Sequence, residues 1–130
     1  MTAKEYLMQY RESIDRANEL NAHLNELKAE AEQLKNHEGQ TIRLDAAVAK
    51  YVDACDDAGA YLEMLAKKRM EIRKAIENVP NKKQRQLLRE IYIDGKRLVQ
   101  IAAERNQTYE HICRLHGIAL NAVRAQGSME

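Results

Sequence analysis

The chain has 130 residues, which suffices for one domain or two small modules and excludes anything larger. Its composition argues against a strand-rich fold, because Phe and Trp are absent, Pro occurs once and Gly five times. The 32% of charged residues, which nearly cancel to a net charge of +1, argue against a single bulky core. The architecture compatible with this composition is a set of long helices that each bury one apolar stripe, and we therefore expect an all-α protein.

A first long helix is expected to begin at the very N-terminus, where Thr2 and Glu5 have the spacing of a capping box. Apolar residues then recur mostly at steps of three and four, as one helical face requires. They are Leu7, Tyr10, Ile14, Ala17, Leu20, Leu24, Leu27, Ala31 and Leu34. The segment Asn36 to Gln40 breaks this pattern, and Gly39 is the natural position for a left-handed turn.

A second helix is expected from about Thr41 to Asn78, with a sustained apolar seam interrupted once, by Arg69. The seam comprises Leu44, Val48, Tyr51, Cys55, Ala58, Leu62, Leu65, Arg69, Ile72, Ile76 and Val79. Pro80 ends this helix, because proline disfavours helical geometry in the residue before it. Two long helices joined by a short connection have to lie antiparallel. Residues 1–79 are therefore predicted to form an antiparallel helical hairpin, a coiled coil.

Further apolar residues of the hairpin lie outside its seams, namely Ile42, Tyr61, Met64 and Met70. A single hairpin leaves them partly exposed, whereas two hairpins paired into a four-helix bundle would cover them. We therefore predict a homodimer through residues 1–79, which serve for oligomerisation or for binding a protein partner.

Residues 80–130 are predicted to form a second module of three helices, at 82–93, 97–105 and 108–124. Its expected core comprises Leu87, Leu88, Ile91, Tyr92, Leu98, Ile101, Ala102, Ile112, Leu115, Ala119 and Val123. Thr108 stands where an N-cap is required, because its hydroxyl can accept hydrogen bonds from backbone amides of the next turn. A short helix, a polar turn and a capped second helix together predict a helix-turn-helix.

The outward face of helix 108–124 is expected to enter the major groove of duplex DNA, N-terminal residues first. Arg114 is the candidate base reader, since Arg pairs bidentately with guanine; a phosphate contact or a surface salt bridge is the alternative. Tyr109 either contacts a base or packs on the turn. Glu110 either accepts a hydrogen bond from cytosine or occupies its position because the helix dipole stabilises an acidic residue near the N-terminus. The predicted DNA-contacting residues are Lys96, Arg97, Thr108, Tyr109, Glu110, His111, Cys113 and Arg114.

Charge is distributed unevenly between the two predicted modules. Residues 1–80 carry 12 basic and 15 acidic side chains, whereas residues 81–130 carry 9 and 5. The basic excess therefore lies on the predicted helix-turn-helix, where contacts with phosphates would need it.

The remaining chemistry-bearing residues indicate neither a metal site nor an enzyme. Cys55 and Cys113 have no metal-type pairing, and no His has a convincing ligand spacing, so that no metal or cofactor is expected. Neither a nucleophile with its base nor a phosphate-binding loop is recognisable. No apolar run approaches the ~20 residues of a membrane span. Two lone cysteines without a signal peptide indicate the cytoplasm.

From Gln84 to Arg124 the chain resembles the fourth region of bacterial sigma factors, which recognises the promoter −35 element. The shared pattern comprises Gln84, Leu87, Ile91, Tyr92, Asp94, Gly95, Leu98, Ile101, Ala102, Thr108, Ile112, Leu115, Ala119 and Leu120. The resemblance implies a DNA-binding helix-turn-helix that also contacts RNA polymerase. The chain departs from the sigma pattern at Arg105-Asn106-Gln107, where polar residues replace the usual apolar residue, glycine and apolar residue.

The whole chain is similar to a family of small proteins carried by phages of Gram-positive bacteria. Those proteins share a start like residues 1–7 and a segment like Arg114 to Leu120. The resemblance implies a transcriptional regulator of phage or prophage origin, acting on duplex DNA in the cytoplasm of the bacterial host. The alternative is a non-enzymatic structural or adaptor protein, whose hairpin binds a protein partner such as RNA polymerase and whose helix-turn-helix is vestigial.

Overall fold

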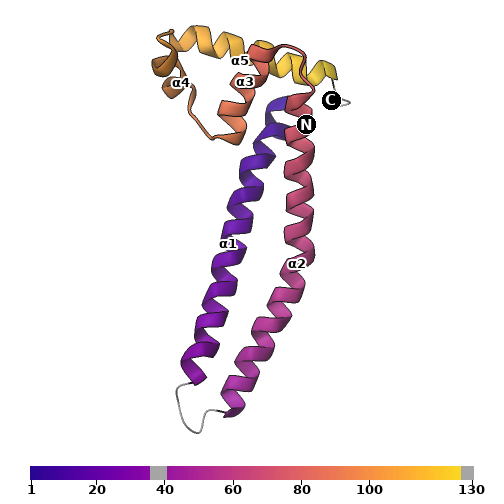
Figure 1. Cartoon of the computed structure of the whole chain (residues 1–130), viewed down its shortest axis with the longest axis vertical. Helices are drawn as coiled ribbons and strands as arrows, with labels where there is room; N and C mark the ends of the chain where they lie inside the picture. The colour runs from indigo at the N-terminus through magenta and orange to yellow at the C-terminus, as the bar shows by residue number, and fades with distance from the viewer. Residues whose placement is uncertain (36–40, 127–130) are drawn as a thin grey trace. The chain divides into compact units, whose positions relative to one another are not determined.

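A computed structural model describes residues 1–35 and 41–126 of the chain. Within these ranges the chain is helical and contains no strand, which confirms the all-α prediction. The elements in chain order are α1 (Ala3–Lys35), α2 (Thr41–Glu77), α3 (Lys82–Leu88), the π-helical η1 (Arg89–Ile93), α4 (Leu98–Arg105) and α5 (Tyr109–Gln126) (Figure 1). The turn expected at Gly39 lies outside the described residues.

The chain divides into two compact units, and each contains part of α1 and part of α2. The hairpin unit comprises residues 14–66. The C-terminal unit comprises residues 1–13 and 67–130. The division therefore falls along the two long helices and not at the joint after Val79. Whether 1–79 and 80–130 act as separate functional modules stays a prediction.

In the hairpin unit, α1 and α2 lie side by side and run antiparallel (Figure 1). Arg16 on α1 donates to the hydroxyl of Tyr61 on α2 over 3.1 Å. Its buried side chains are Leu27, Ala31, Ala47, Ala58 and Leu65. The predicted seam is thus confirmed apart from Val48, which is exposed because its neighbour Ala47 takes the buried position.

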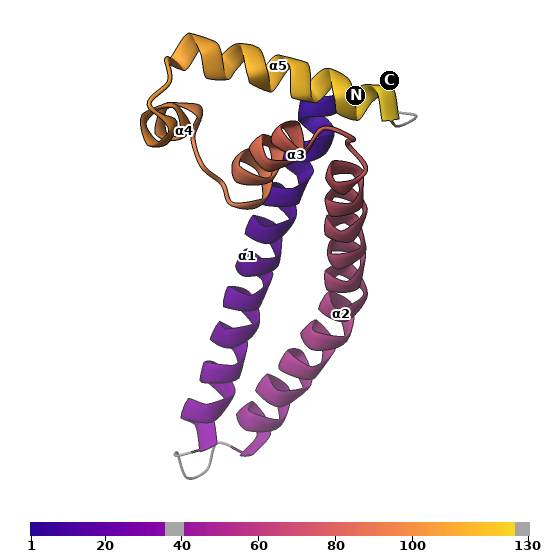
Figure 2. The ribbon, with the colours of Figure 1, turned by 45° about the horizontal axis from the view of Figure 1, so that its top comes forward.

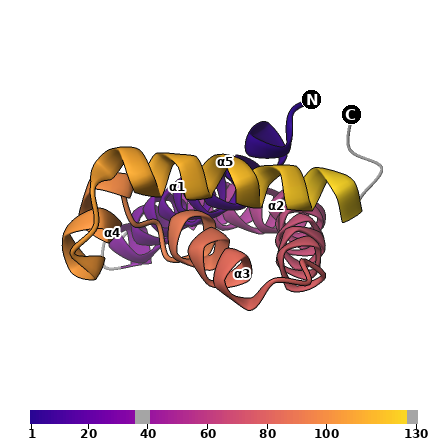
Figure 3. The same ribbon diagram turned by 90° about the horizontal axis from the view of Figure 1, so that it is seen from above.

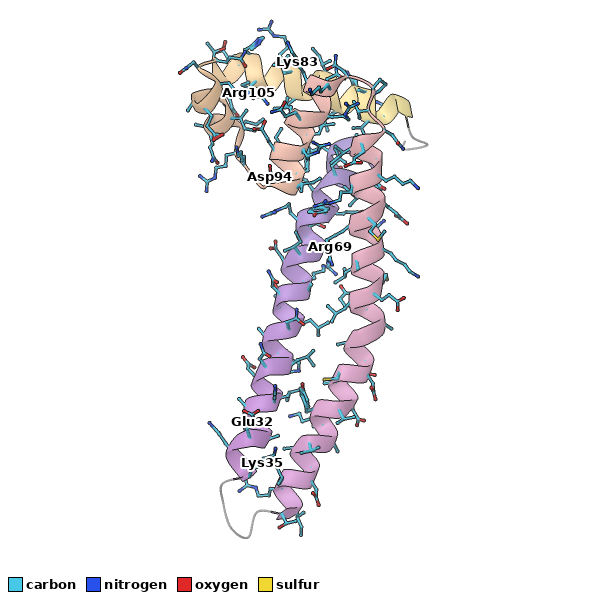
Figure 4. The ribbon with its side chains drawn as sticks, in the orientation of Figure 1. Glu32, Lys35, Arg69, Lys83, Asp94 and Arg105 are labelled. Atoms are coloured by element: carbon cyan, nitrogen blue, oxygen red, sulfur yellow. The ribbon has the colours of Figure 1, made fainter. Side chains whose placement is uncertain are left out.

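In the C-terminal unit, the beginning of α1 packs against the end of α2. The buried apolar residues of this contact are Ala3, Leu7, Tyr10, Ile72, Ile76 and Val79. The polar interruption at Arg69 (Figure 4) is accommodated by Ser13. The Ser13 hydroxyl accepts from the Arg69 guanidinium over 3.5 Å and donates to the carbonyl of Tyr10 over 2.7 Å. One turn further on, Arg73 donates to the Tyr10 hydroxyl over 3.2 Å.

The helix ends follow the local signals in the sequence. The backbone N–H of Glu5 donates to the Thr2 hydroxyl over 3.1 Å, as a capping box requires. Helix α2 stops at Glu77, shortly before Pro80. The side chain of Asn81 then caps α3 by accepting from the backbone N–H groups of Lys83 and Gln84, over 2.9 and 3.2 Å.

The helix predicted over 82–93 has the expected limits, but its last turn is π-helical and not α-helical. Residues Arg89–Ile93 form a wider π-helical turn, in which the backbone N–H of Asp94 donates to the carbonyl of Arg89 over 2.9 Å. The following Gly95 has a φ of +75°. Arg11 on α1 donates to the carbonyl of Ile93 over 2.8 Å, and its guanidinium lies so close to Gly95 that a Cβ there would be 2.8 Å from it. Tertiary contact with α1 therefore shapes this turn.

Candidate nucleic-acid interface

Helices α4 and α5 are joined by a turn of three residues whose geometry is fixed by hydrogen bonds. Asn106 ends α4 in the left-handed region, with φ 54° and ψ 43°, a conformation that Asn tolerates better than most residues. The backbone N–H of Gln107 donates to the Ala102 carbonyl over 2.9 Å. The hydroxyl of Thr108 accepts from the backbone N–H of His111 over 3.1 Å, which confirms the predicted N-cap.

The two helices share one apolar core with α3. Leu87, Ile101, Ala102 and Ile112 form its buried centre, and the partly buried side chains of Ile91, Leu98 and Leu115 pack against it. Helix α5 contacts both α3 and α4 (Figures 2 and 3). The core residues predicted for these helices are therefore buried or half-buried, and the orientation of α5 is fixed by its apolar side.

The opposite side of α5 is exposed and takes no part in this packing. Glu110, Arg114 and Gly117 are all exposed, and their spacing places them on one helical face. The Arg114 side chain makes no ion pair or hydrogen bond with the residues that the structure describes. This is the part of the predicted interface that is available to a ligand.

The predicted contact residues Tyr109 and Cys113 lie about one turn apart on one flank of that face. The neighbouring Cys113 thiol is the main cause of the raised pKa of the Tyr109 phenol. The Tyr109 side chain nonetheless stays 51% exposed, so its ring remains available for stacking. His111 is half-buried on the other flank, and Thr108 contributes its side chain to the cap.

Lys96, also a predicted DNA contact, is engaged by two carboxylates. Its ammonium lies 3.0 Å from a Glu104 oxygen and 3.5 Å from a Glu90 oxygen, and the hydrogen bond with Glu104 is the main cause of its raised pKa. Arg97, by contrast, is exposed at the start of α4 and makes no ion pair or hydrogen bond through its side chain with described residues. Of these two cations, Arg97 is the one free to contact a phosphate.

The polar turn is supported by an ion pair that sequence reasoning missed. Arg105, at the end of α4, donates to the carboxylate of Glu90 on η1, and both side chains are largely buried. Because Glu90 also pairs with Lys96, one carboxylate links the turn before α4 with the turn after it. Polar contacts thus replace the apolar packing that the sigma pattern would place beneath the turn. No periodicity in the sequence signals a contact over this separation.

A second missed contact is a buried hydrogen bond of 2.7 Å between the Tyr92 hydroxyl and Nε2 of His116. Burial raises the pKa of Tyr92 to about 12, and burial followed by the charge of Lys4 lowers the pKa of His116. Both shifts favour a pair in which the phenol and the imidazole are both neutral. The bond joins η1 to α5 close to the start of α1, and so helps to set the position of α5.

A groove of about 470 Å³ lies beside the exposed face, between α3 and α5. Its lining combines apolar, polar and basic residues and contains no acidic residue: Lys83, Gln84, Gln86, Leu87, Arg105, Gln107, His111, Leu115 and Ile118. Lys83 and Arg105 project on this side of the C-terminal unit (Figure 4). The predicted contact residue His111 belongs to this groove, whereas Tyr109 and Cys113 do not.

Within the described ranges, no group of three or more His, Cys, Asp and Glu side chains is arranged to hold a metal ion. Among the described helices, none combines the length and the apolar character that crossing a membrane requires. Comparison with models of known protein families, with curated proteins and with solved structures finds no match to this chain.

Proposed function

We propose that α4 and α5 form a helix-turn-helix that binds duplex DNA, with α5 in the major groove. The observation that carries this proposal is the capped, core-fixed orientation of α5, which leaves the face of Arg114 exposed and without a partner. Arg97 at the start of α4 is in the place to contact a phosphate. The resemblance to the fourth region of sigma factors and to phage proteins supports a role as a transcriptional regulator of phage or prophage origin.

The electrostatics of the module favour modest affinity. Five exposed cations between α3 and the end of α5 make no ion pair or hydrogen bond through their side chains with the described residues: Lys82, Lys83, Arg97, Arg114 and Arg124. Glu110 adds a negative charge to the outward face of α5, where it would repel phosphates and accept from a cytosine amino group. We therefore expect binding that depends strongly on salt and on the sequence of the duplex.

The test is a selection of binding sites from random duplexes with the full chain, followed by titration of the selected duplex at several salt concentrations. Each phosphate contact that releases a counterion contributes about 0.9 to the slope of log affinity against log salt. We expect an enriched sequence and a slope of roughly −3 to −5 from the five free cations. Failure to enrich any sequence, together with a slope near zero, would contradict DNA binding.

A protein-binding adaptor is the alternative, and the pairing of Lys96 and Arg105 with carboxylates favours it. These two cations are unavailable to phosphates without breaking an ion pair, which lowers the positive potential of the module. In that case the helix-turn-helix is vestigial and the exposed apolar side chains of the long helices, including Ile42 and Met64, contact a protein such as RNA polymerase. A salt-independent interaction with a purified polymerase, without DNA binding, would support this alternative.

A further inference from the structure

A pocket of about 240 Å³ lies between the start of α1 and the last turns of α5, away from the groove beside α3. Both segments belong to the C-terminal unit, and they lie side by side in it (Figures 2 and 3). The polar side chains that line the pocket are Thr2, Lys4, Asn121 and Arg124. Its described lining thus contains two cations, one from each end of the chain, and no carboxylate.

The two cations of this pocket are both available to a ligand. Lys4 and Arg124 are exposed, and neither side chain makes an ion pair or hydrogen bond with the residues that the structure describes. After burial, the charge of Lys4 is the second cause of the lowered pKa of His116, so the ammonium lies close enough to α5 to act on it. Two cations that line one pocket repel each other, whereas an anion bound between them attracts both. The pocket therefore suits an anion.

The pocket also continues the outward face of α5 on which Arg114 lies. Exposed residues follow one another along this face at steps of four, three, four and three: Glu110, Arg114, Gly117, Asn121 and Arg124. At 3.6 residues per turn, these five side chains fall within an arc of about 80°. The face that turns Arg114 toward a duplex therefore ends at the pocket, beside Lys4.

The length of α5 indicates what this end of the face meets. Arg124 follows Arg114 by ten residues, which is about 15 Å along the helix axis at 1.5 Å per residue. The major groove is about 12 Å wide. A straight helix that holds Arg114 against the base edges therefore carries Arg124 past the groove, to the sugar-phosphate backbone. The anions available there are phosphates, which receive many of the hydrogen bonds that proteins make with DNA.

We propose that Lys4 and Arg124 bind the phosphodiester backbone of the duplex, at the same phosphate or at neighbouring ones. The start of α1 then forms part of the nucleic-acid interface. This inference rests on the DNA binding proposed above, and it adds a contact that positions α5 in the groove. Lys4 provides a point charge, and the guanidinium of Arg124 donates to the phosphate oxygens. Because every sequence has the same backbone, the contact contributes affinity and no sequence preference.

The salt dependence of binding distinguishes this phosphate contact from base reading. With Lys4→Ala in the full chain, the slope of log affinity against log salt should become shallower by about 0.9. The loss of affinity should therefore be about 3.5 times larger at 50 mM than at 200 mM salt. It should be equal on the selected duplex and on one of scrambled sequence. Arg124→Ala should behave alike, whereas Arg114→Ala should lose affinity mainly for the selected duplex.

Neutral phosphates in the DNA locate the contact. Uncharged methylphosphonates replace the phosphates of the selected duplex one at a time, and each duplex is titrated with the wild-type chain. We expect weaker binding where the replaced phosphate lies about 15 Å from the base that Arg114 reads. At those positions the double variant Lys4→Ala, Arg124→Ala should bind the neutral and the charged duplex equally, because the contact is already lost.

Lys28→Ala is the matched control, since it removes the same charge from an exposed position further along α1. It should keep the wild-type slope, and all these variants should keep the wild-type melting temperature, because the replaced side chains are exposed. A slope lowered as much by Lys28→Ala as by Lys4→Ala, or a lowered melting temperature for Lys4→Ala, would overturn the inference.

Two further results separate this inference from the proposed function. If the wild-type chain binds the duplex and Lys4→Ala binds it with the same slope, the inference is wrong while DNA binding stands. If millimolar inorganic phosphate then raises the melting temperature of the wild-type chain but not of Lys4→Ala, the pocket holds a free anion instead. A wild-type chain that binds no duplex would overturn both the inference and the proposed function.

Discussion

The C-terminal unit and the hairpin unit are both helical, but they bury their side chains to different depths. The largest fully buried side chains of the described residues all belong to the C-terminal unit: Leu7, Ile72, Ile76, Val79, Leu88, Ile101, Ile112 and Val123. The hairpin unit buries mainly small residues and leaves Ile42, Val48, Val52 and Met64 exposed. Since apolar burial is the dominant stabilising contribution, the stability of the chain resides mainly in the C-terminal unit.

The helices of the two units also differ in how they are packed. In the C-terminal unit α5 contacts both α3 and α4 through a shared core, and it is thereby oriented with one face outward. In the hairpin unit α1 and α2 pack against each other, and Val48 and Val52 of α2 stay exposed. The first arrangement fixes one outward face of a helix, whereas the second leaves apolar side chains in contact with solvent.

The largest effect is expected from a charge in the core beneath α5. Ile112→Asp buries an unpaired carboxylate and should destabilise the C-terminal unit by more than about 4 kcal/mol, enough to unfold it. Ile118→Asp is the matched control on the same helix, since Ile118 is 47% exposed, and should cost about 0.5 kcal/mol. Urea unfolding followed by circular dichroism measures both. Similar effects at the two positions would mean that the buried side of α5 is assigned incorrectly.

Truncation at the predicted module boundary should also be severe. A chain of residues 80–130 lacks Leu7, Ile72 and Ile76, three of the fully buried side chains of its unit, and should not fold. A chain in which a short flexible linker replaces residues 14–66 keeps the whole unit and should fold. Thermal unfolding of the two shortened chains tests this. A cooperative transition in residues 80–130 alone would show that the chain divides into folding units at Val79 and Pro80, as the sequence predicted.

The outcome of sequence reasoning depends on the range of each interaction. Helix limits rest on local signals such as Thr2, Pro80 and Thr108, and they were predicted to within a few residues. The core of α3 to α5 followed from helical periodicity alone. The bond between Tyr92 and His116 could not be predicted, because its partners are 24 residues apart and periodicity does not show which buried side chains meet.

Long sequence separation also explains why two features of the C-terminal unit were not predicted. The π-helical turn before Asp94 is tied to Arg11 by a contact that spans 82 residues. The polar turn is held by Glu90, whose pairing with Arg105 and Lys96 is a matter of tertiary position. For the candidate interface, periodicity identified the exposed face with Arg114, but it could not show that Lys96 is already paired.

A smaller effect is expected where Arg11 meets Gly95. Gly95→Ala adds a Cβ 2.8 Å from the Arg11 guanidinium at a φ of +75°, and should destabilise the C-terminal unit by about 1–2 kcal/mol. Combining it with Arg11→Ala should remove the collision and leave only the strain of positive φ. The double variant should therefore lose less than the sum of the two single losses in urea unfolding. Strict additivity would show that the two residues do not touch.

The buried His116 should make stability depend mildly on pH. Its pKa is lowered in the folded chain, so the unfolded chain binds the proton more readily and stability falls as pH drops below the unfolded value of about 6.5. The loss is complete once the pH is below the folded pKa. Melting temperatures at pH 7.5 and 5.5 measure it, and His116→Gln should reduce the difference between them. The exposed His23 provides the control, since His23→Gln should leave the difference unchanged.

The central claim is that the exposed face of α5 binds DNA while its buried side holds the fold. The most direct measurement compares Arg114→Ala with Lys28→Ala, which removes the same charge from an exposed position of the hairpin unit, in titrations of the selected duplex at fixed salt. Loss of one bidentate base contact, ~1–3 kcal/mol, should weaken binding by Arg114→Ala roughly 5- to 150-fold and leave its melting temperature unchanged. Lys28→Ala should bind like the wild-type chain. Equal affinities for all three proteins, or a lowered melting temperature for Arg114→Ala, would contradict the account.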